Sequence, residues 1–290
     1  MLKNKLVIGT VQFGLNYGVA NNEGITNETE ALNILCAAKS NGINTLDTAI
    51  LYGRSEEVLG QLGVRDFQII SKIPPIPDNV SNVSDWVDEQ VQQSLGKMKI
   101  SSLYALLLHA PSQLLSSKGE DLYNALLKLK DNGIVKKTGV SIYAPGELDA
   151  IVNKYDIDLV QSPFSILDTR IIESGWAQKL KDKGIELHAR SIFLQGLLLM
   201  NHDTRPMKFN FWHKVWSTWD AWLEKQSVSA VDACISYVFQ QDLIDKVVVG
   251  FESMKQFNQV INSNIEDIST YPSFTTLNDE LINPSKWDEL

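Results

Sequence analysis

Four polar side chains of types used in proton transfer stand at or just after the ends of short apolar runs. Asp47 follows the run at 43–46, Tyr52 comes five residues later, Lys72 follows 67–71, and His109 follows 103–108. In a barrel of parallel strands, residues at the carboxyl ends of the strands meet on one face, where catalytic groups are found. If these runs are strands of one barrel, their spacing predicts that the four side chains converge.

Together these groups have the chemistry needed for hydride transfer to a carbonyl. A phenol is a weak acid at neutral pH, but a nearby ammonium favours the phenolate and makes proton donation easier. We therefore predict that Tyr52 is a general acid, that Lys72 supplies the ammonium, and that Asp47 holds Lys72 in place. His109 is predicted to donate a hydrogen bond to the carbonyl oxygen as negative charge develops there.

A different chemistry also uses a lysine at a strand end. A lyase would form a Schiff base between the amine of Lys72 and a carbonyl substrate. Any one of these strand-end residues alone is more often a solvated rim group or half of an ion pair. The prediction of carbonyl reduction therefore depends on all four residues together, and Asp47 and Tyr52 make it the better hypothesis.

The elements that must position these groups alternate between short apolar runs and amphipathic segments. Strands are predicted at 6–8, 43–47, 67–71, 103–108, 135–140, 159–160, 186–189 and 246–249. Helices are predicted from Thr26 or Asn27 to Ser40, and at 55–62, 85–98, 121–131, 145–154, 171–183, 211–226, 229–240 and 253–262. Apolar periodicity, capping residues and the glycines or prolines between the segments carry these assignments.

Eight strand and helix units are the number that closes a (β/α)8 barrel, and 290 residues are enough for one such domain. We expect a single domain over 1–290, with an irregular C-terminal tail at 264–290. The alternative is an open, doubly wound sheet, which needs a Gly-x-Gly-x-x-Gly turn directly before a helix. The segment from Gly9 to Gly14 has different glycine spacing and no immediate helix, so the barrel is preferred.

Composition limits the partners. The chain has 26 Lys and Arg against 35 Asp and Glu, a net charge of −9, and no basic block, which argues against nucleic acid and favours a small-molecule partner. No apolar run approaches the roughly 18 residues of a membrane span. Without a signal-like start, a cytoplasmic protein is expected. Cys36 and Cys234 are predicted to be small core residues, and no metal site is predicted because no His and carboxylate pair has ligand spacing.

Several motifs resemble the aldo-keto reductase family. They are Gly42-Ile43-Asn44-Thr45-Leu46-Asp47-Thr48-Ala49, then Tyr52-Gly53 and Ser55-Glu56-x-x-Leu59-Gly60, the strand-end Lys72 and His109, and Lys137-Thr138-Gly139-Val140-Ser141. The resemblance extends over roughly 6–261. It implies a barrel enzyme that reduces an aldehyde or ketone, a sugar or sugar derivative included, with hydride from a nicotinamide cofactor and the proton from Tyr52. It implies NADPH, with NADH as the alternative.

The resemblance also implies a set of cofactor-binding positions. Ser141 and Gln161 would hydrogen-bond the nicotinamide carboxamide, Gly9 and Thr10 would lie close to the cofactor, and a loop after the seventh strand would pass the pyrophosphate. The full predicted set is Gly9, Thr10, Ser141, Gln161, Arg190, Ser191, Phe193, Leu194, Gln195, Gly196, Gly250 and Lys255.

Three positions depart from the family pattern. Ile142 follows Ser141 where Asn is frequent, and Arg190 stands where many members stack a Tyr on the nicotinamide ring. In the segment that binds the adenosine 2′-phosphate, Gln256 replaces an Arg, Glu252 would repel a phosphate, and Lys255 is the obvious cation. These changes put the preference for NADPH in doubt. They also motivate an alternative function, a non-catalytic regulatory barrel that retains the cofactor.

Other aromatic and histidine side chains have simpler interpretations. The tryptophans at 212, 216, 219 and 222 have helical spacing and are predicted to pack as a helix face, although Trp212 or Trp216 would wall a substrate pocket in a second interpretation. Tyr17 is a weaker candidate for that wall. His188 is predicted to be a hydrogen-bonded interior residue. Substrate specificity is assigned to the loops at 9–24, 74–82, 110–119 and 191–210.

Overall fold

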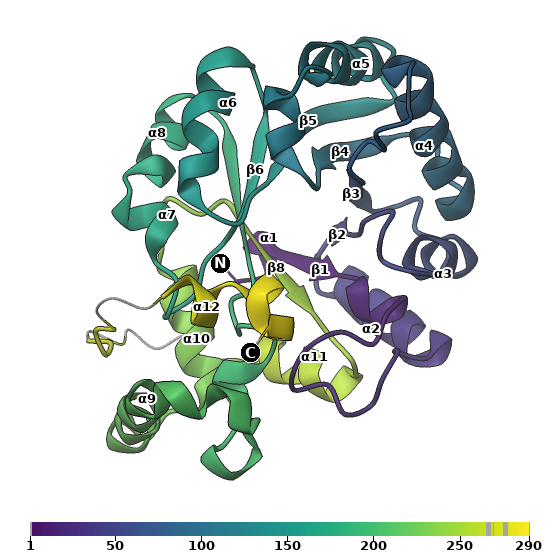
Figure 1. The fold of residues 1–290 in the computed structure, drawn as a ribbon. Helices are drawn as coiled ribbons and strands as arrows, with labels where there is room; N and C mark the ends of the chain where they lie inside the picture. The colour runs from purple at the N-terminus through teal and green to yellow at the C-terminus, as the bar shows by residue number, and fades with distance from the viewer. Residues whose placement is uncertain (1, 265–267, 269, 275–277, 290) are drawn as a thin grey trace.

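The computed structural model describes residues 2–264, 268, 270–274 and 278–289, and it contains a closed barrel of eight parallel strands. Each strand pairs with its sequence neighbour, and the last pairs with the first. Figure 1 shows the strands and the helices around them. The strands are β1 (Leu6–Gly9), β2 (Thr45–Asp47), β3 (Gln68–Ile73), β4 (Leu103–Leu108), β5 (Val135–Ser141), β6 (Leu159–Pro163), β7 (Glu186–Arg190) and β8 (Lys246–Gly250). The predicted barrel is confirmed, and the open sheet is excluded.

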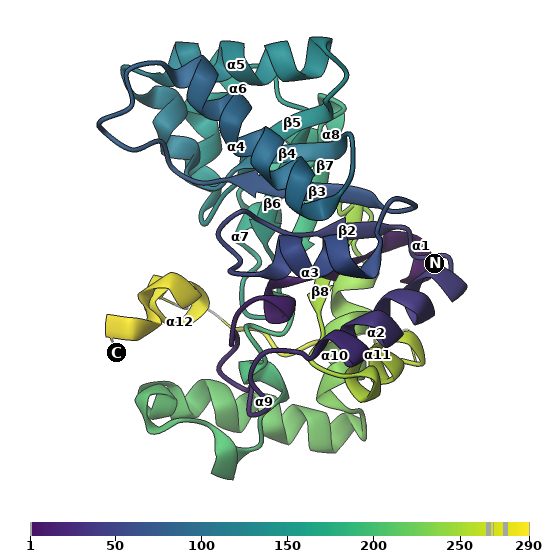
Figure 2. The same ribbon diagram turned by 90° about the vertical axis from the view of Figure 1, so that its right-hand side faces the viewer.

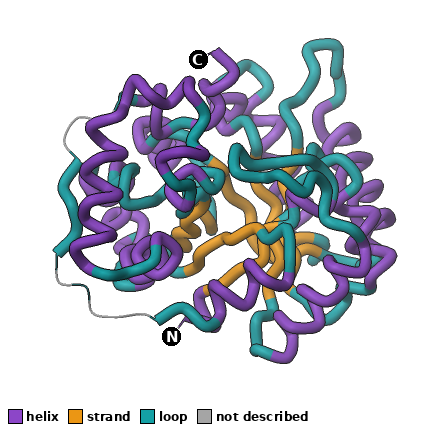
Figure 3. The backbone as a smooth tube through the Cα atoms, turned by 90° about the horizontal axis from the view of Figure 1, so that it is seen from below, coloured by secondary structure: helices purple, strands orange, loops and turns teal. Residues whose placement is uncertain are grey.

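Helices lie on the outside of the barrel, and in Figure 3 the strands occupy the middle of the molecule with helices on both sides. They are α1 (Leu2–Lys5), α2 (Glu28–Ser40), α3 (Ser55–Leu62), α4 (Val83–Met98), α5 (Gly119–Asp131), α6 (Leu148–Lys154), α7 (Arg170–Glu173), α8 (Trp176–Asp182), α9 (His213–Gln226), α10 (Ala230–Phe239), α11 (Met254–Ile261) and α12 (Asp279–Ile282). Short 3₁₀ turns precede or connect several of them, at Val11–Phe13, Pro111–Leu115, Pro145–Glu147, Leu197–Leu199, His202–Thr204, Met207–Trp212 and Pro284–Glu289.

Strand periodicity explains how the core divides. Successive side chains of a strand point to opposite faces, and in β4 the side chains of Leu106 and Leu108 pack in the large cluster shared with the helices, whereas Ala105 and Leu107 belong to a small separate cluster. That small cluster also contains Ile70 and Leu159. It forms the floor of the barrel interior, and Lys72, two residues beyond Ile70, points the same way.

A second core lies outside the barrel. The tryptophans of α9 pack with residues from the loop after β7 and from the C-terminal segment, and Trp219 and Leu281 are both fully buried there. Figure 2 shows α9 at the edge of the molecule, beyond the barrel. All four tryptophans predicted to form one helix face pack in this core, but Trp212 belongs to the preceding 3₁₀ turn and Trp222 is only half-buried.

The structure corrects several sequence-based expectations. The helix expected at 171–183 is interrupted, because Gly175 adopts a left-handed φ of 76° between α7 and α8. The irregular tail expected at 264–290 contains α12 and a 3₁₀ turn that join the second core, where Trp287 contacts Phe209; its residues 265–267, 269, 275–277 and 290 lie outside the described residues. Cys36 was expected in the core but is exposed, since it falls on the outer side of α2, whereas Cys234 is buried.

His188 also differs from expectation. It is buried inside the barrel, but neither ring nitrogen makes a hydrogen bond, and the Glu186 carboxylate lies 3.4 Å from Nε2.

No helix among the described residues has both the length and the apolar character needed to cross a membrane.

Candidate active site

The four strand-end residues meet at one end of the barrel. Asp47 is the last residue of β2, Lys72 lies near the end of β3, His109 follows β4, and Tyr52 occupies the loop between β2 and α3. The Tyr52 ring centroid lies 5.0 Å from Lys72 Nζ and 5.9 Å from the His109 ring centroid. The convergence predicted from strand ends is therefore present in the geometry.

Lys72 and Asp47 form a buried ion pair behind Tyr52. Nζ of Lys72 lies 2.5 Å from Oδ1 of Asp47, and it also donates to the carbonyl oxygen of Thr48 at 2.9 Å. Burial alone would lower the pKa of Lys72, but the charge of Asp47 and the phenol of Tyr52 outweigh it, and the net shift is upward. Lys72 is therefore a fixed ammonium at neutral pH.

Gln161 completes this pair from across the barrel. Its Nε2 donates to Oδ2 of Asp47 at 2.7 Å, and both side chains are buried. Each oxygen of the carboxylate thus has its own donor, which offsets the cost of burying the charge. The sequence did not indicate this contact.

His109 is held in its neutral form. Its pKa is lowered from 6.5 to about 4, first by burial and then by the positive charges of Lys72 and Arg190. Its Nδ1 is buried and has no hydrogen-bond partner. Because a buried N–H without an acceptor costs more than a bare lone pair, the ring proton belongs on Nε2, the nitrogen left to meet a ligand.

Close backbone packing fixes the loop that carries Tyr52. A Cβ placed on Gly14 would lie 1.9 Å from the carbonyl oxygen of Tyr52, so only glycine permits this approach. Ser55, at the start of α3, donates to Thr10 at 2.9 Å, and Thr10 in turn donates to the carbonyl oxygen of Asp47. The first loop, the Tyr52 loop and the end of β2 are therefore locked together.

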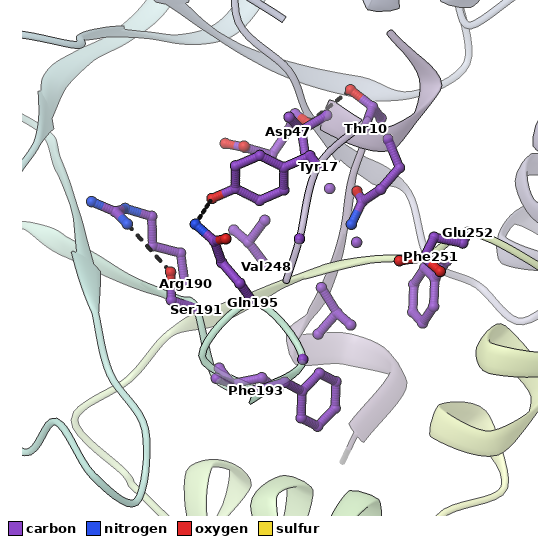
Figure 4. Close-up of a pocket in the computed structure, with 18 of the residues that line it drawn as sticks. Thr10, Tyr17, Asp47, Arg190, Ser191, Phe193, Gln195, Val248, Phe251 and Glu252 are labelled. Carbon is purple, nitrogen blue, oxygen red and sulfur yellow. Dashed lines mark hydrogen bonds between the residues drawn. The ribbon is translucent and has the colours of Figure 1, made fainter. Parts of the chain in front are cut away.

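A cavity of about 500 Å³ opens over these groups. Asp47, Tyr52 and His109 line it, and it extends past the ends of β7 and β8 (Figure 4). Its walls also include the loop at 191–199 and residues of the first loop. No described residue of the loops at 74–82 or 110–119 lines it, so the expected contribution of those two loops to the pocket is not observed.

Most predicted cofactor residues line this cavity. Those that do are Gly9, Thr10, Ser141, Gln161, Arg190, Ser191, Phe193, Gln195, Gly196 and Gly250. Leu194 does not, because its side chain is buried against the α9 cluster. Lys255 does not either, because it is exposed on α11 while Glu252 and Gln256 face the cavity.

Arg190 is stacked on a protein ring in this structure. Its guanidinium lies 4.8 Å from the Tyr143 ring centroid, and Nη2 donates to the carbonyl oxygen of Ile142 at 2.9 Å. Nη1 lies 3.3 Å from the hydroxyl of Ser191. Arg190 is the only Lys or Arg that lines the cavity in the described part of the chain.

Several lining residues were not singled out from the sequence, among them Gln12, Tyr143, Leu199, Val231 and Gln259. Tyr17 was a weak candidate, and it lines the cavity with its hydroxyl accepting a hydrogen bond from Gln195 at 3.1 Å (Figure 4). Trp212 and Trp216 are absent from the lining and pack in the second core. Their helical spacing pointed to packing, but nothing in the sequence ranked Tyr17 above them.

Over the described residues, no group of three His, Cys, Asp or Glu side chains is placed to hold a metal ion.

Comparison with known proteins gives one consistent result. The model of the aldo/keto reductase family matches residues 5–272. The chain is 26% identical over 258 residues to the uncharacterized oxidoreductase YqkF of Bacillus subtilis (strain 168), covering 82% of this chain and 83% of that protein. It is 24% identical over 291 residues to a D-threo-aldose 1-dehydrogenase of Pseudomonas sp, covering 84% and 87%. Among solved structures, an aldo-keto reductase from Bacillus halodurans in its holo form aligns with a TM-score of 0.69 at 19% identity, covering 93% and 88%.

Proposed function

This chain belongs to the aldo/keto reductase family and is an NAD(P)-dependent oxidoreductase, and we propose that it reduces an aldehyde or ketone to an alcohol with Tyr52 as the proton donor. One observation carries the proposal. Tyr52 and His109 face the same cavity, and the buried pair of Lys72 and Asp47 lies directly behind the phenol.

We propose that the cavity binds a nicotinamide dinucleotide. Gly9 and Gly250 are paired in β1 and β8, and both line the cavity. A Cβ on Gly250 would lie 2.3 Å from Oε1 of Gln12, an oxygen that is buried without a hydrogen-bond partner. Because neither glycine has a side chain, the two strands present bare backbone to the cavity. When bound, a reduced nicotinamide would supply the hydride.

Ser141 and Gln161 are the residues proposed to hold the carboxamide of that ring. Both line the cavity, Ser141 from the end of β5 and Gln161 from the middle of β6. Because Nε2 of Gln161 is committed to Asp47, its Oε1 is the atom left to accept a hydrogen bond from the ligand. The same residue would then fix the ion pair and orient the ring.

The protein groups divide the proton chemistry among them. Nε2–H of His109 is proposed to donate to the carbonyl oxygen and orient it, from a ring that is neutral because its pKa is lowered to about 4. The Tyr52 hydroxyl then gives its proton to the same oxygen as the alcohol forms. Lys72 stabilises the phenolate that remains, and Asp47 keeps the ammonium in place.

The substrate is proposed to be a small aldehyde or ketone, sugars and their derivatives included. Support comes from the mixed polar and apolar lining, which includes Tyr17, Gln195 and Phe193, and from the aldose dehydrogenase among the relatives. The resemblance in sequence implies NADPH as the reductant. The carboxylate of Glu252, which also lines the cavity, favours NADH.

The lyase alternative finds no support in this geometry. Schiff-base formation needs a neutral amine that can reach the substrate. Lys72 is 1% exposed, is absent from the cavity lining, donates to two oxygens, and has a raised pKa.

Replacement of Tyr52 by Phe tests the proposal. We expect kcat to fall by about 10²- to 10⁴-fold, the usual contribution of a general acid, while cofactor binding measured by tryptophan fluorescence is retained. Tyr17→Phe is the matched control. It also removes a phenolic hydroxyl from the cavity, and that hydroxyl accepts a hydrogen bond from Gln195. Full activity of the Tyr52 variant would reject the assignment, and failure of the wild-type protein to turn over any aldehyde would favour the regulatory barrel.

A further inference from the structure

The end of the cavity remote from Tyr52 carries a carboxylate, that of Glu252. Glu252 and Gln256, which follow β8, line the same cavity as the catalytic groups, and Figure 4 places Glu252 on the opposite side of the pocket from Arg190. A dinucleotide with its reactive ring at Tyr52 must place its other end elsewhere in this cavity. The residues beyond β8 are therefore candidates to contact the second ribose.

Glu252 makes this end acidic. It is half-buried, and its pKa is raised, first by burial and also by the negative charge of Glu23, while the hydrogen bond from Gln256 acts in the opposite direction. Arg190, the only Lys or Arg in the described lining, sits near His109 and acts on its pKa. Lys255 is exposed and outside the lining. Among the described residues that line this end, a phosphate would meet the carboxylate of Glu252 and no Lys or Arg.

Gln256 is also committed to Glu252. Its Nε2 donates to Oε2 of Glu252 at 3.1 Å, and its Oε1 accepts from the Glu252 backbone N–H at 2.8 Å. This pairing holds the carboxylate at the cavity wall. It also engages Gln256, the residue that stands where the resemblance implies an Arg for the 2′-phosphate.

The start of α11 offers little to an anion. Backbone N–H groups at a helix start normally bind phosphate well, but here the N–H of Met254 donates to the carboxylate of Glu30 at 2.6 Å. The N–H of Gln256 lies 3.4 Å from the hydroxyl of Ser253, the N-cap residue. An internal carboxylate and an internal hydroxyl thus engage two of the N–H groups that a phosphate would use.

We propose that Glu252 selects the unphosphorylated ribose of NADH and rejects the 2′-phosphate of NADPH. A carboxylate can accept hydrogen bonds from the two ribose hydroxyls, whereas it repels a phosphate dianion. The inference rests on the proposed function, because it assumes that this cavity binds a nicotinamide dinucleotide with the ring at Tyr52.

Binding titrations test the inference without turnover. NADH and NADPH are added separately to the wild-type protein and to Glu252→Gln at physiological ionic strength, and quenching of tryptophan fluorescence gives each Kd. We expect the wild type to bind NADH at least about tenfold more tightly, since like charges in a partly buried site oppose association. In Glu252→Gln the preference should shrink, chiefly through tighter NADPH binding.

Glu28→Gln is the matched control. It removes the same charge from an exposed position in the first turn of α2, away from the cavity lining, and should leave both Kd values unchanged. A second variant, Gln256→Arg, adds a cation at the cavity wall and should raise NADPH affinity. Equal or tighter NADPH binding by the wild type, or an unchanged ratio in Glu252→Gln, would overturn the inference alone. Binding of neither cofactor would overturn the proposed function and the inference with it.

Discussion

Replacing Lys72 by Met should destabilise the fold as well as stop turnover, because a buried carboxylate loses its counter-ion. The side chains of Lys72 and Asp47 are 1% and 4% exposed, and their charged atoms lie 2.5 Å apart. In the variant, Gln161 remains as a donor to Asp47 at 2.7 Å. Removing one partner of a buried pair costs about 3 to 5 kcal/mol, and we expect the lower end of that range because the Gln161 hydrogen bond persists.

A double-mutant cycle separates the pair from the rest of the site. Asp47→Asn keeps an oxygen beside Lys72, which still donates to Thr48, so a loss of about 2 kcal/mol is expected. The double variant buries no charge at either position and should be only about 2 kcal/mol less stable than the wild type. The two single losses then exceed the double loss by about 3 kcal/mol, the coupling energy of the pair.

Urea unfolding at pH 7, followed by tryptophan fluorescence, measures the four free energies of unfolding. Losses that add without coupling, or single losses below about 1 kcal/mol, would refute a strongly coupled buried pair. All three variants should have lost turnover. Because the net pKa shift of Lys72 is upward from 10.5, its stabilising contribution is complete at neutral pH and is lost only as the pH rises through the raised value.

Two further predictions concern neighbours of the pair. The pKa of His109 is lowered from 6.5 to about 4, so the unfolded chain binds more protons in that interval and the wild-type free energy of unfolding should fall by up to about 3 kcal/mol as the pH drops through it. His109→Gln should flatten that part of the stability profile, and an unaltered slope would contradict the neutral buried imidazole. Gln161→Leu removes the donor to Oδ2 of Asp47 and should cost about 1 to 3 kcal/mol in urea unfolding and lower kcat. Gln161→Glu should cost more because it places a second carboxylate there, and a Leu variant as stable as the wild type would show that the contact contributes nothing.

The barrel could be predicted because its strands carry local signals. The run at 103–108 is continuously apolar, as a strand buried on both faces must be, and β4 has the same bounds. The tail could not be predicted in this way. Its helices are short and depend on tertiary contacts, such as the contact of the Trp287 ring with Phe209, and a short helix has little intrinsic stability to signal its presence.

The grouping of Asp47, Lys72 and His109 was predictable because they end three consecutive strands. Asp47 ends β2 and Gln161 lies in the middle of β6, and these strands are not neighbours in the barrel. Their contact crosses the interior, where side-chain length and the tilt of both strands decide which groups meet. Strand order fixes which backbones are adjacent, but it does not say which side chains reach across, so the partner of Oδ2 was missed.

The direction of a side chain also explains why Lys255 was wrongly placed at the cavity. The sequence showed a cation close to the expected phosphate site, but successive residues of a helix point about 100° apart. The helix begins after Ser253, whose hydroxyl caps it, and Glu30 from α2 binds the first N–H. That start directs Gln256 to the cavity wall and Lys255 to solvent. The phase of α11 thus depends on a contact with a residue more than two hundred positions away, and it turns the expected phosphate end of the cavity into an acidic one.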